Sequence, residues 1–124
     1  MTISKRHDPF TASKDYAEGG KYHGIYAHGV ETECGARTLR ISGQICVSPD
    51  GILSKNFKGQ CNQAVLNLQS VLKSADMDFE NIVKMSFFLT RPKDMQELIE
   101  VRQKYLDGVR PAVTTLIVSE LVSP

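Results

Sequence analysis

Apolar residues recur along this chain first at every second position, then about every 3.6 positions, and then at every second position again. This order of strand-like and helix-like patterns constrains the fold more than any other feature. Alternation up to Val47 gives way to a helical spacing over 57–75, a second alternation over 82–90, another helical spacing and a β-branched stretch over 114–119. The order predicts an α/β (α+β) fold, in which a hairpin is followed by two strand-helix-strand crossovers. Because such crossovers are right-handed, we expect both helices on one sheet face.

The hairpin is predicted from period-two patterning around the sequence Ser42-Gly43-Gln44. Five apolar or small residues share one face of its second strand: Leu39, Ile41, Gly43, Ile45 and Val47. The stretch Ile25 to Thr32 is expected to pair with this strand, and Pro49-Asp50-Gly51 has the composition of the turn that ends it.

Both helices are predicted from apolar stripes. The first stripe contains Cys61, Ala64, Val65, Leu68, Val71, Leu72 and Ala75. The second contains Met95, Leu98, Ile99, Arg102, Tyr105 and Leu106, with Asp94 as the expected N-cap and Gly108 at the C-terminal end. Leu66 lies outside the first stripe, which leaves two interpretations open: a single exposed leucine, or a contact with a neighbouring subunit.

The length of 124 residues allows one hydrophobic core. We expect an irregular N-terminal segment over 1–23, which lacks periodicity, followed by a single domain over 24–124. Helices on one sheet face leave the other face uncovered, and the strand rows on both sides contain large apolar residues such as Ile82, Phe88 and Leu116. The uncovered face predicts an oligomer.

Composition narrows the classes of partner and cofactor. Fifteen Lys and Arg against fourteen Asp and Glu give a formal charge of +1, so we do not expect a nucleic-acid partner. No apolar run approaches the roughly 18 residues of a membrane span, so a cytoplasmic protein without membrane contact is expected. Cys34, Cys46 and Cys61 lack Cys-x-x-Cys spacing, which favours free thiols over a disulfide or zinc site. We expect no metal and no cofactor.

Ser42-Gly43-Gln44 is the most unusual polar cluster, because glycine inside a strand is disfavoured unless the strand bulges or another group approaches the backbone. Two interpretations therefore stay open, a bend in the strand or a ligand site. Tyr26 and His28, two residues apart on the paired strand, are expected on the same side as Ser42.

Arginine side chains provide the remaining candidates. Arg102 lies on an apolar stripe, where a guanidinium either extends to the rim or meets a carboxylate ligand or a partner subunit. Arg110 is interpreted as a solvated loop charge. The common nucleotide, hydrolase and zinc-protease motifs are absent from the sequence.

Several segments in a fixed order resemble the RidA family, also called YjgF or the L-PSP endoribonuclease family. They are Tyr26-Ala-His-Gly-Val30, Ile41-Ser-Gly-Gln-Ile45, Gln63-Ala64 with Asn67-Leu68, Val83-Lys84, Phe88-Leu89-Thr90 and Arg110-Pro111-Ala112. The resemblance implies a chorismate-mutase-like fold, a homotrimer and small-molecule clefts between subunits. It implies a ligand cleft containing Tyr26, His28, Ser42, Gly43, Gln44, Val113 and Thr114, with Arg102 as a further candidate. Catalytic residues are not assigned.

The chain departs from the deaminating branch of that family at three places. Val113 stands where that branch has a carboxylate-binding arginine, and Ile99 stands near a helix asparagine of some active members. The sequence also stops at Pro124, before the family's last strand with its glutamate, which leaves two interpretations open: the sequence is cut short, or this member lacks that strand; Glu120 lies too early to match the glutamate. The resemblance is therefore to a branch without the deaminase arginine.

Three functions follow from the resemblance. The first is a hydrolase (enamine/imine deaminase) that converts reactive intermediates to keto compounds and ammonia in intersubunit clefts, with Tyr26 lining the cleft and the backbone near Ser42-Gly43 polarising the substrate. The alternative is a non-catalytic trimer that binds small metabolites, with uncharged ligands beside Val113. The third is an endoribonuclease of the L-PSP type.

Overall fold

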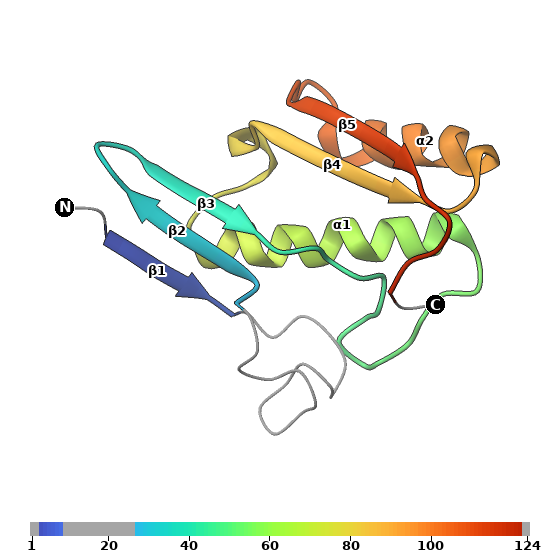
Figure 1. The fold of residues 1–124 in the computed structure, drawn as a ribbon, viewed down its shortest axis with the longest axis horizontal. Helices are drawn as coiled ribbons and strands as arrows, with labels where there is room; N and C mark the ends of the chain where they lie inside the picture. The colour runs from blue at the N-terminus through green and yellow to red at the C-terminus, as the bar shows by residue number, and fades with distance from the viewer. Residues whose placement is uncertain (1–2, 9–26, 123–124) are drawn as a thin grey trace. The chain divides into compact units, whose positions relative to one another are not determined.

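The computed structural model describes residues 3–8 and 27–122, which form two compact units divided after Asp78. Each unit is described by itself. The first contains three antiparallel strands and a long helix, and the second contains two parallel strands and a shorter helix (Figure 1). Whether 24–124 behaves as one domain stays a prediction.

The sheet of the first unit has the order β1-β2-β3, formed by Ile3–His7, Gly29–Glu33 and Arg37–Ile41. β2 and β3 pair antiparallel with Gly29 opposite Ile41 and Glu33 opposite Arg37, which confirms the predicted hairpin. Gly35 occupies its turn with a φ of 85°, a left-handed conformation that glycine adopts without steric cost.

The expectation of an irregular segment over 1–23 is wrong for Ile3–His7, which forms the edge strand β1. The exposed side chains of Ser4, Lys5 and Arg6 give this strand no apolar alternation, so no pattern marks it. Its order comes from backbone pairing with β2 and from the buried His7 side chain. Residues 1–2 and 9–23 of that segment, like Tyr26, lie outside the described residues.

The predicted second strand is too long, because β3 ends at Ile41 instead of continuing to Val47. The Ser42 N–H makes one further bond to the His28 carbonyl, and the chain then leaves the ladder. The backbone carbonyls of Ile45 and Val47 accept hydrogen bonds from the Asn67 side chain, at 2.9 and 3.0 Å. The side-chain amide of Asn67 thus takes the place of the strand partner that these carbonyls would have in a longer β3.

Helix α1, Phe57–Ser74, confirms the first predicted helix. Asn56 caps it, with its Oδ1 accepting from the Gly59 N–H at 2.8 Å. The stripe is buried at Cys61, Val65, Val71 and Leu72, whereas Leu66 is 37% exposed, so Leu66 is not a core residue. The helix approaches the hairpin closely at Gly29, where a Cβ would lie 3.1 Å from Val71 Cγ1, so a larger residue there would push against the helix.

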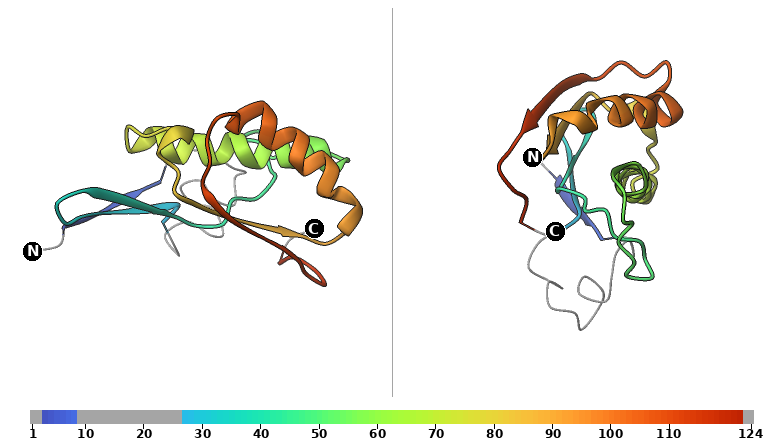
Figure 2. Two further views of the ribbon diagram at one scale, coloured as in Figure 1. Left: turned by 90° about the horizontal axis from the view of Figure 1, so that it is seen from above. Right: turned by 90° about the vertical axis from the view of Figure 1, so that its right-hand side faces the viewer.

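The second unit begins with a 3-10 turn, Phe79–Asn81, followed by β4, Lys84–Leu89. A second 3-10 turn, Pro92–Asp94, leads into α2, Met95–Leu106, and the chain returns as β5, Ala112–Ile117. β4 and β5 are parallel with Met85 opposite Val113, which confirms the strand-helix-strand crossover within this unit. Both views in Figure 2 show α2 running beside this pair of strands.

Two details of α2 differ from the prediction. Asp94 does not cap the helix through its side chain. Its carboxylate instead accepts two hydrogen bonds from Arg91, at 2.9 and 3.1 Å, because the arginine three residues earlier is a stronger partner than a backbone amide. The buried face contains Leu98 and Leu106 as predicted, but also Val101, while Ile99 is exposed.

Candidate functional site

A polar cluster forms where the chain leaves the β2–β3 hairpin, between His28 and the sequence Ser42-Gly43-Gln44. The Ser42 hydroxyl donates to the Ala27 carbonyl at 2.6 Å. The Gln44 amide donates to the Ser42 carbonyl at 3.1 Å and lies 3.5 Å from His28 Nδ1. The Gln44 amide thus lies beside one ring nitrogen of the His28 imidazole. The structure therefore brings His28, Ser42 and Gln44 together, as the alternation predicted for His28 and Ser42.

Gly43 is the exposed centre of this cluster. Its φ does not fall in the left-handed region, and no atom beyond its chain neighbours lies within 4 Å of the point where a Cβ would stand. Neither backbone strain nor close packing within the described residues explains a glycine here. What the position provides is backbone that another molecule can approach closely.

The loop that carries this cluster is fixed by Asn67 of α1. Asn67 is 3% exposed, and its Nδ2 donates to the Ile45 and Val47 carbonyls while its Oδ1 accepts from Gln63 at 2.9 Å. Sequence reasoning gave Asn67 no structural role. The sequence does place Asn67 next to the apolar stripe of the helix, at Leu68. A side-chain amide that is buried there needs hydrogen-bond partners, and these come from another segment.

Cys46 follows the cluster directly. Burial raises the pKa of its thiol, because a low-dielectric surrounding disfavours the thiolate. Cys61 is buried and Cys34 is exposed in the hairpin turn; all three cysteines are free thiols. Because the thiolate is the reactive form, Cys46 is not prepared as a nucleophile at neutral pH.

A second group of polar residues connects the three strands of the first unit. His7 Nε2 is 2.9 Å from Glu31 Oε1, and Arg37 donates to Glu31 Oε2 at 3.1 Å and to the Ala75 carbonyl at 2.8 Å. The hydrogen bond from His7, followed by that from Arg37, holds the pKa of Glu31 below its ordinary value. His7 and Glu31 are buried, and this ion-pair group joins β1, β2 and the end of α1.

Val113 and Thr114 lie on β5 in the second unit, and their side chains point to opposite faces because they are adjacent on a strand. Thr114 is exposed, and its Oγ1 accepts from Lys84 Nζ at 2.7 Å. Val113 is half-buried and shares the other face with Met85, its partner in the register. The two residues thus present different chemistry to different sides of the strand.

Arg102 projects from α2 toward the same face of β4, with its Cζ 5.5 Å from the centre of the Phe87 ring. A guanidinium over an aromatic face is stabilised by the ring quadrupole. Its Nε is buried, and no hydrogen-bond acceptor among residues 3–8 and 27–122 reaches it.

The described residues contain neither a metal-binding cluster nor a membrane-spanning helix. Within them, no three His, Cys, Asp or Glu side chains gather as a metal ion would require. Neither α1 nor α2 has the length and apolar character of a membrane-spanning helix, and the described part of the chain contains no other candidate.

Curated proteins similar to this chain come from bacteria and mammals. A RutC family protein from Aquifex aeolicus (strain VF5) is 38% identical over 101 residues, which cover 79% of this chain and 78% of the relative. A 2-iminobutanoate/2-iminopropanoate deaminase from Mus musculus is 32% identical over 91 residues, covering 72% of this chain and 65% of the relative.

Solved structures share the fold. The protein YyfA from Yersinia pestis, described as a protein of unknown function of the conserved Rid protein family, superposes with a TM-score of 0.81 at 27% identity, covering 98% of this chain and 90% of that one. The sequence profile described as Endoribonuclease L-PSP matches residues 21–124. The chain therefore has the RidA/YjgF fold and belongs to the Endoribonuclease L-PSP family.

Proposed function

We propose that this protein hydrolyses reactive 2-imino acids, or their enamine tautomers, to 2-oxo acids and ammonia. The observation that carries the proposal is the approachable Gly43 backbone beside His28, Ser42 and Gln44, in a chain 32% identical to a protein named 2-iminobutanoate/2-iminopropanoate deaminase. A catalytic site requires polar groups held in place by their surroundings. Here the hydrogen bonds of Ser42, Gln44 and Asn67 hold the chain where it leaves the β2–β3 hairpin, which supports the proposal.

The reaction needs water and no cofactor. Water adds to the imine carbon as the C=N double bond becomes single, and the nitrogen takes a proton. The resulting carbinolamine collapses, the C–N bond breaks, and the hydroxyl proton leaves with ammonia as the C=O bond forms. In the proposed site the substrate lies against the Gly43 backbone, and the His28 imidazole, whose Nδ1 is 3.5 Å from the Gln44 amide nitrogen, moves the proton. The raised pKa of Cys46 argues against a covalent thiolate route.

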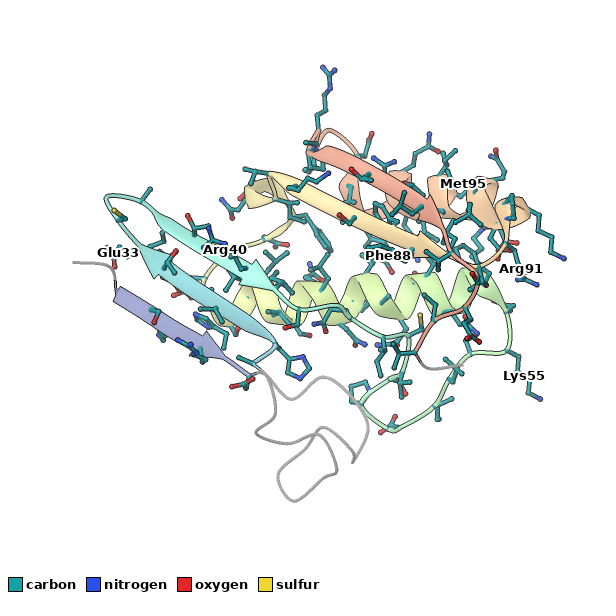
Figure 3. The ribbon with its side chains drawn as sticks, in the orientation of Figure 1. Glu33, Arg40, Lys55, Phe88, Arg91 and Met95 are labelled. Atoms are coloured by element: carbon teal, nitrogen blue, oxygen red, sulfur yellow. The ribbon has the colours of Figure 1, made fainter. Side chains whose placement is uncertain are left out.

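Assembly is part of the proposal. Phe88 is 53% exposed on β4, and Leu116, its partner in the β4–β5 register, is 49% exposed (Figure 3 labels Phe88). This exposed pair, which we call the apolar row, supports a homotrimer in which copies of the chain cover one another's rows. The proposal includes a cytoplasmic location, where Cys34, Cys46 and Cys61 would stay free thiols.

A non-catalytic trimer that binds small metabolites is the second candidate. The observation that favours it is Val113, a half-buried apolar side chain on β5 that offers a ligand no charge and no hydrogen bond.

The test is release of pyruvate from 2-aminoacrylate generated by a dehydratase, measured with and without the purified protein. We expect release to be faster than in buffer. Gly43→Val sharpens the test, because a Cβ at this position meets no atom within 4 Å among residues 3–8 and 27–122 other than its chain neighbours, so the melting temperature should stay near the wild-type value. Loss of activity without loss of stability would then report a blocked approach to the backbone.

Ser70→Ala, an exposed position on α1, is the matched control and should keep wild-type activity. Pyruvate release no faster than in buffer would overturn the hydrolase proposal. Full activity of Gly43→Val would remove Gly43 from the site.

A further inference from the structure

The sheet of the first unit has one face that α1 does not cover. Side chains alternate between the two faces of a strand, and the face with the buried His7, Gly29 and Glu31 is the one that approaches α1. We call the opposite face the outer face. Its residues are all exposed or half-buried, and they form two rows across the three strands: Ser4, Thr32 and Thr38 in one row, and Arg6, Val30 and Arg40 in the next.

The two arginines of the outer face incline toward the same pair of hydroxyls. Arg6 Nη1 donates to Ser4 Oγ at 3.0 Å, and Arg40 Nη1 donates to Thr32 Oγ1 at 3.3 Å (Figure 3 labels Arg40). Ser4 and Thr32 are partners in the β1–β2 register, and the Cβ atoms of such partners are about 5 Å apart. The two guanidinium groups therefore lie over neighbouring hydroxyls, although β2 separates their own strands.

The positive charges of Arg6 and Arg40 have no carboxylate partner among residues 3–8 and 27–122. Two other arginines of the chain do meet carboxylates: Arg37 pairs with Glu31 at 3.1 Å, and Arg91 pairs with Asp94 at 2.9 Å. A hydroxyl oxygen satisfies one N–H and neutralises no charge. Because two like charges on neighbouring positions of a sheet repel each other, an anion that sits between them is favourable.

The acidic residue that follows β1 does not fill this place. Asp8 comes two residues after Arg6, and its Oδ1 accepts from the His28 backbone N–H at 3.0 Å. Arg6 instead bonds to Ser4, two residues before it on the strand. The arginine side chain thus extends away from Asp8 along β1, toward the hydroxyl row.

The donors of the outer face match a phosphate group. Each guanidinium has five N–H donors, of which one is used here, and a hydroxyl that accepts a hydrogen bond still has its own proton to donate. A phosphate monoester carries nearly two negative charges and three terminal oxygens, whereas a carboxylate carries one charge and two oxygens. Two arginines with two hydroxyls suit the phosphate. A polynucleotide would require a longer basic stripe than these two arginines form.

We propose that the outer face binds a dianionic phosphate group between Arg6 and Arg40. The phosphate oxygens accept from both guanidinium groups, with the hydroxyls of Ser4 and Thr32 as further donors. This site is separate from the proposed hydrolysis and uses neither His28 nor Gly43. Because the anion would connect β1 with β3 across β2, its binding should raise the melting temperature of the protein.

The test is calorimetric titration of the whole protein with phenyl phosphate and with inorganic phosphate, at constant ionic strength and at pH 8, above the second phosphate pKa of about 6. We expect saturable binding to one site per chain. Arg6→Gln and Arg40→Gln should each weaken that binding by roughly 10- to 100-fold. Tighter binding of phenyl phosphate assigns the site to monoesters, and equal binding assigns it to the free anion; either result supports the proposal.

Lys5→Gln is the matched control, because it removes one positive charge from an exposed position of β1 that points to the other face. It should change the dissociation constants by less than about twofold. Arg6→Lys and Arg40→Lys keep the charge without the planar fork and should fall between wild type and the glutamine variants. They keep the test valid if a glutamine variant loosens the edge strand, which its melting temperature without ligand would reveal.

Four results would overturn the proposal. The first is no saturable binding of either phosphate to the wild type at millimolar concentration, and the second is unchanged affinity in both glutamine variants. A loss in Lys5→Gln as large as in Arg6→Gln would show only a general effect of charge. Dimethyl phosphate, a singly charged diester like the nucleic-acid backbone, should bind more weakly than phenyl phosphate, and equal binding would contradict recognition of a dianion.

Discussion

The two units of the chain differ in how completely their buried polar groups are satisfied. In the unit 1–78 the buried polar side chains of His7, Glu31 and Asn67 all have partners within the same unit. In the unit 79–124 a buried Nε of Arg102 has no partner in the described chain, and the apolar row of Phe88 and Leu116 is exposed. The buried groups of the unit 1–78 stabilise the fold of the first unit, whereas the candidate cluster around Gly43 in the same unit is not fully buried. The second retains groups that a ligand or another copy of the chain can satisfy.

Asn67→Leu breaks the internal network of the first unit and should give the largest effect on stability. It leaves the Ile45 and Val47 carbonyls without their donor, which should lower the free energy of unfolding by about 2–4 kcal/mol. Urea denaturation measures the change. Gln103→Leu, exposed on α2, is the control and should stay within about 0.5 kcal/mol of wild type. An equally small effect of Asn67→Leu would show that the first unit does not depend on this network.

A smaller, pH-dependent effect is expected from the ion-pair group of His7, Glu31 and Arg37. Because the pKa of Glu31 is lowered in the folded protein, its ionised form stabilises the fold above the ordinary carboxyl range near 4.5. This contribution is lost as the pH falls through the lowered folded value. The urea midpoint of the wild type should therefore exceed that of Glu31→Gln at pH 6, and the difference should shrink as the pH falls below the ordinary carboxyl value of 4.5 and through the lowered folded value.

Glu33→Gln, exposed at the end of the same strand, is the control for removing one carboxylate. A constant difference between wild type and Glu31→Gln across the acidic range would mean that the carboxylate charge contributes nothing.

The parts of the fold that the sequence predicted are those with local periodicity. The stripe of α1 and the alternation in β4 need only their own residues to be recognised, and the hairpin follows from patterns joined by a short turn. β1 could not be predicted, because an edge strand with solvated side chains has no alternation. The end of β3 at Ile41 depends on Asn67, more than 20 residues later, so no local pattern contains it.

The candidate site was predictable to a similar extent. Alternation placed His28 and Ser42 near each other, because both lie at the open end of one hairpin. The role of Arg102 was left open, since its position on an apolar stripe does not reveal whether an acceptor lies within reach. Hydrogen-bond satisfaction depends on three-dimensional neighbours, so only the structure distinguishes a satisfied arginine such as Arg91 from an unsatisfied one.

The native mass of the purified protein, measured by sedimentation for wild type and for Phe88→Lys, tests most directly whether the second unit is completed by other copies of the chain. We expect three chains per particle for the wild type and one for Phe88→Lys, because a lysine in the apolar row opposes its burial. Gln103→Lys, which adds the same charge on α2, should remain trimeric. A wild-type mass of one chain at micromolar concentration, or a trimer that persists in Phe88→Lys, would contradict this account.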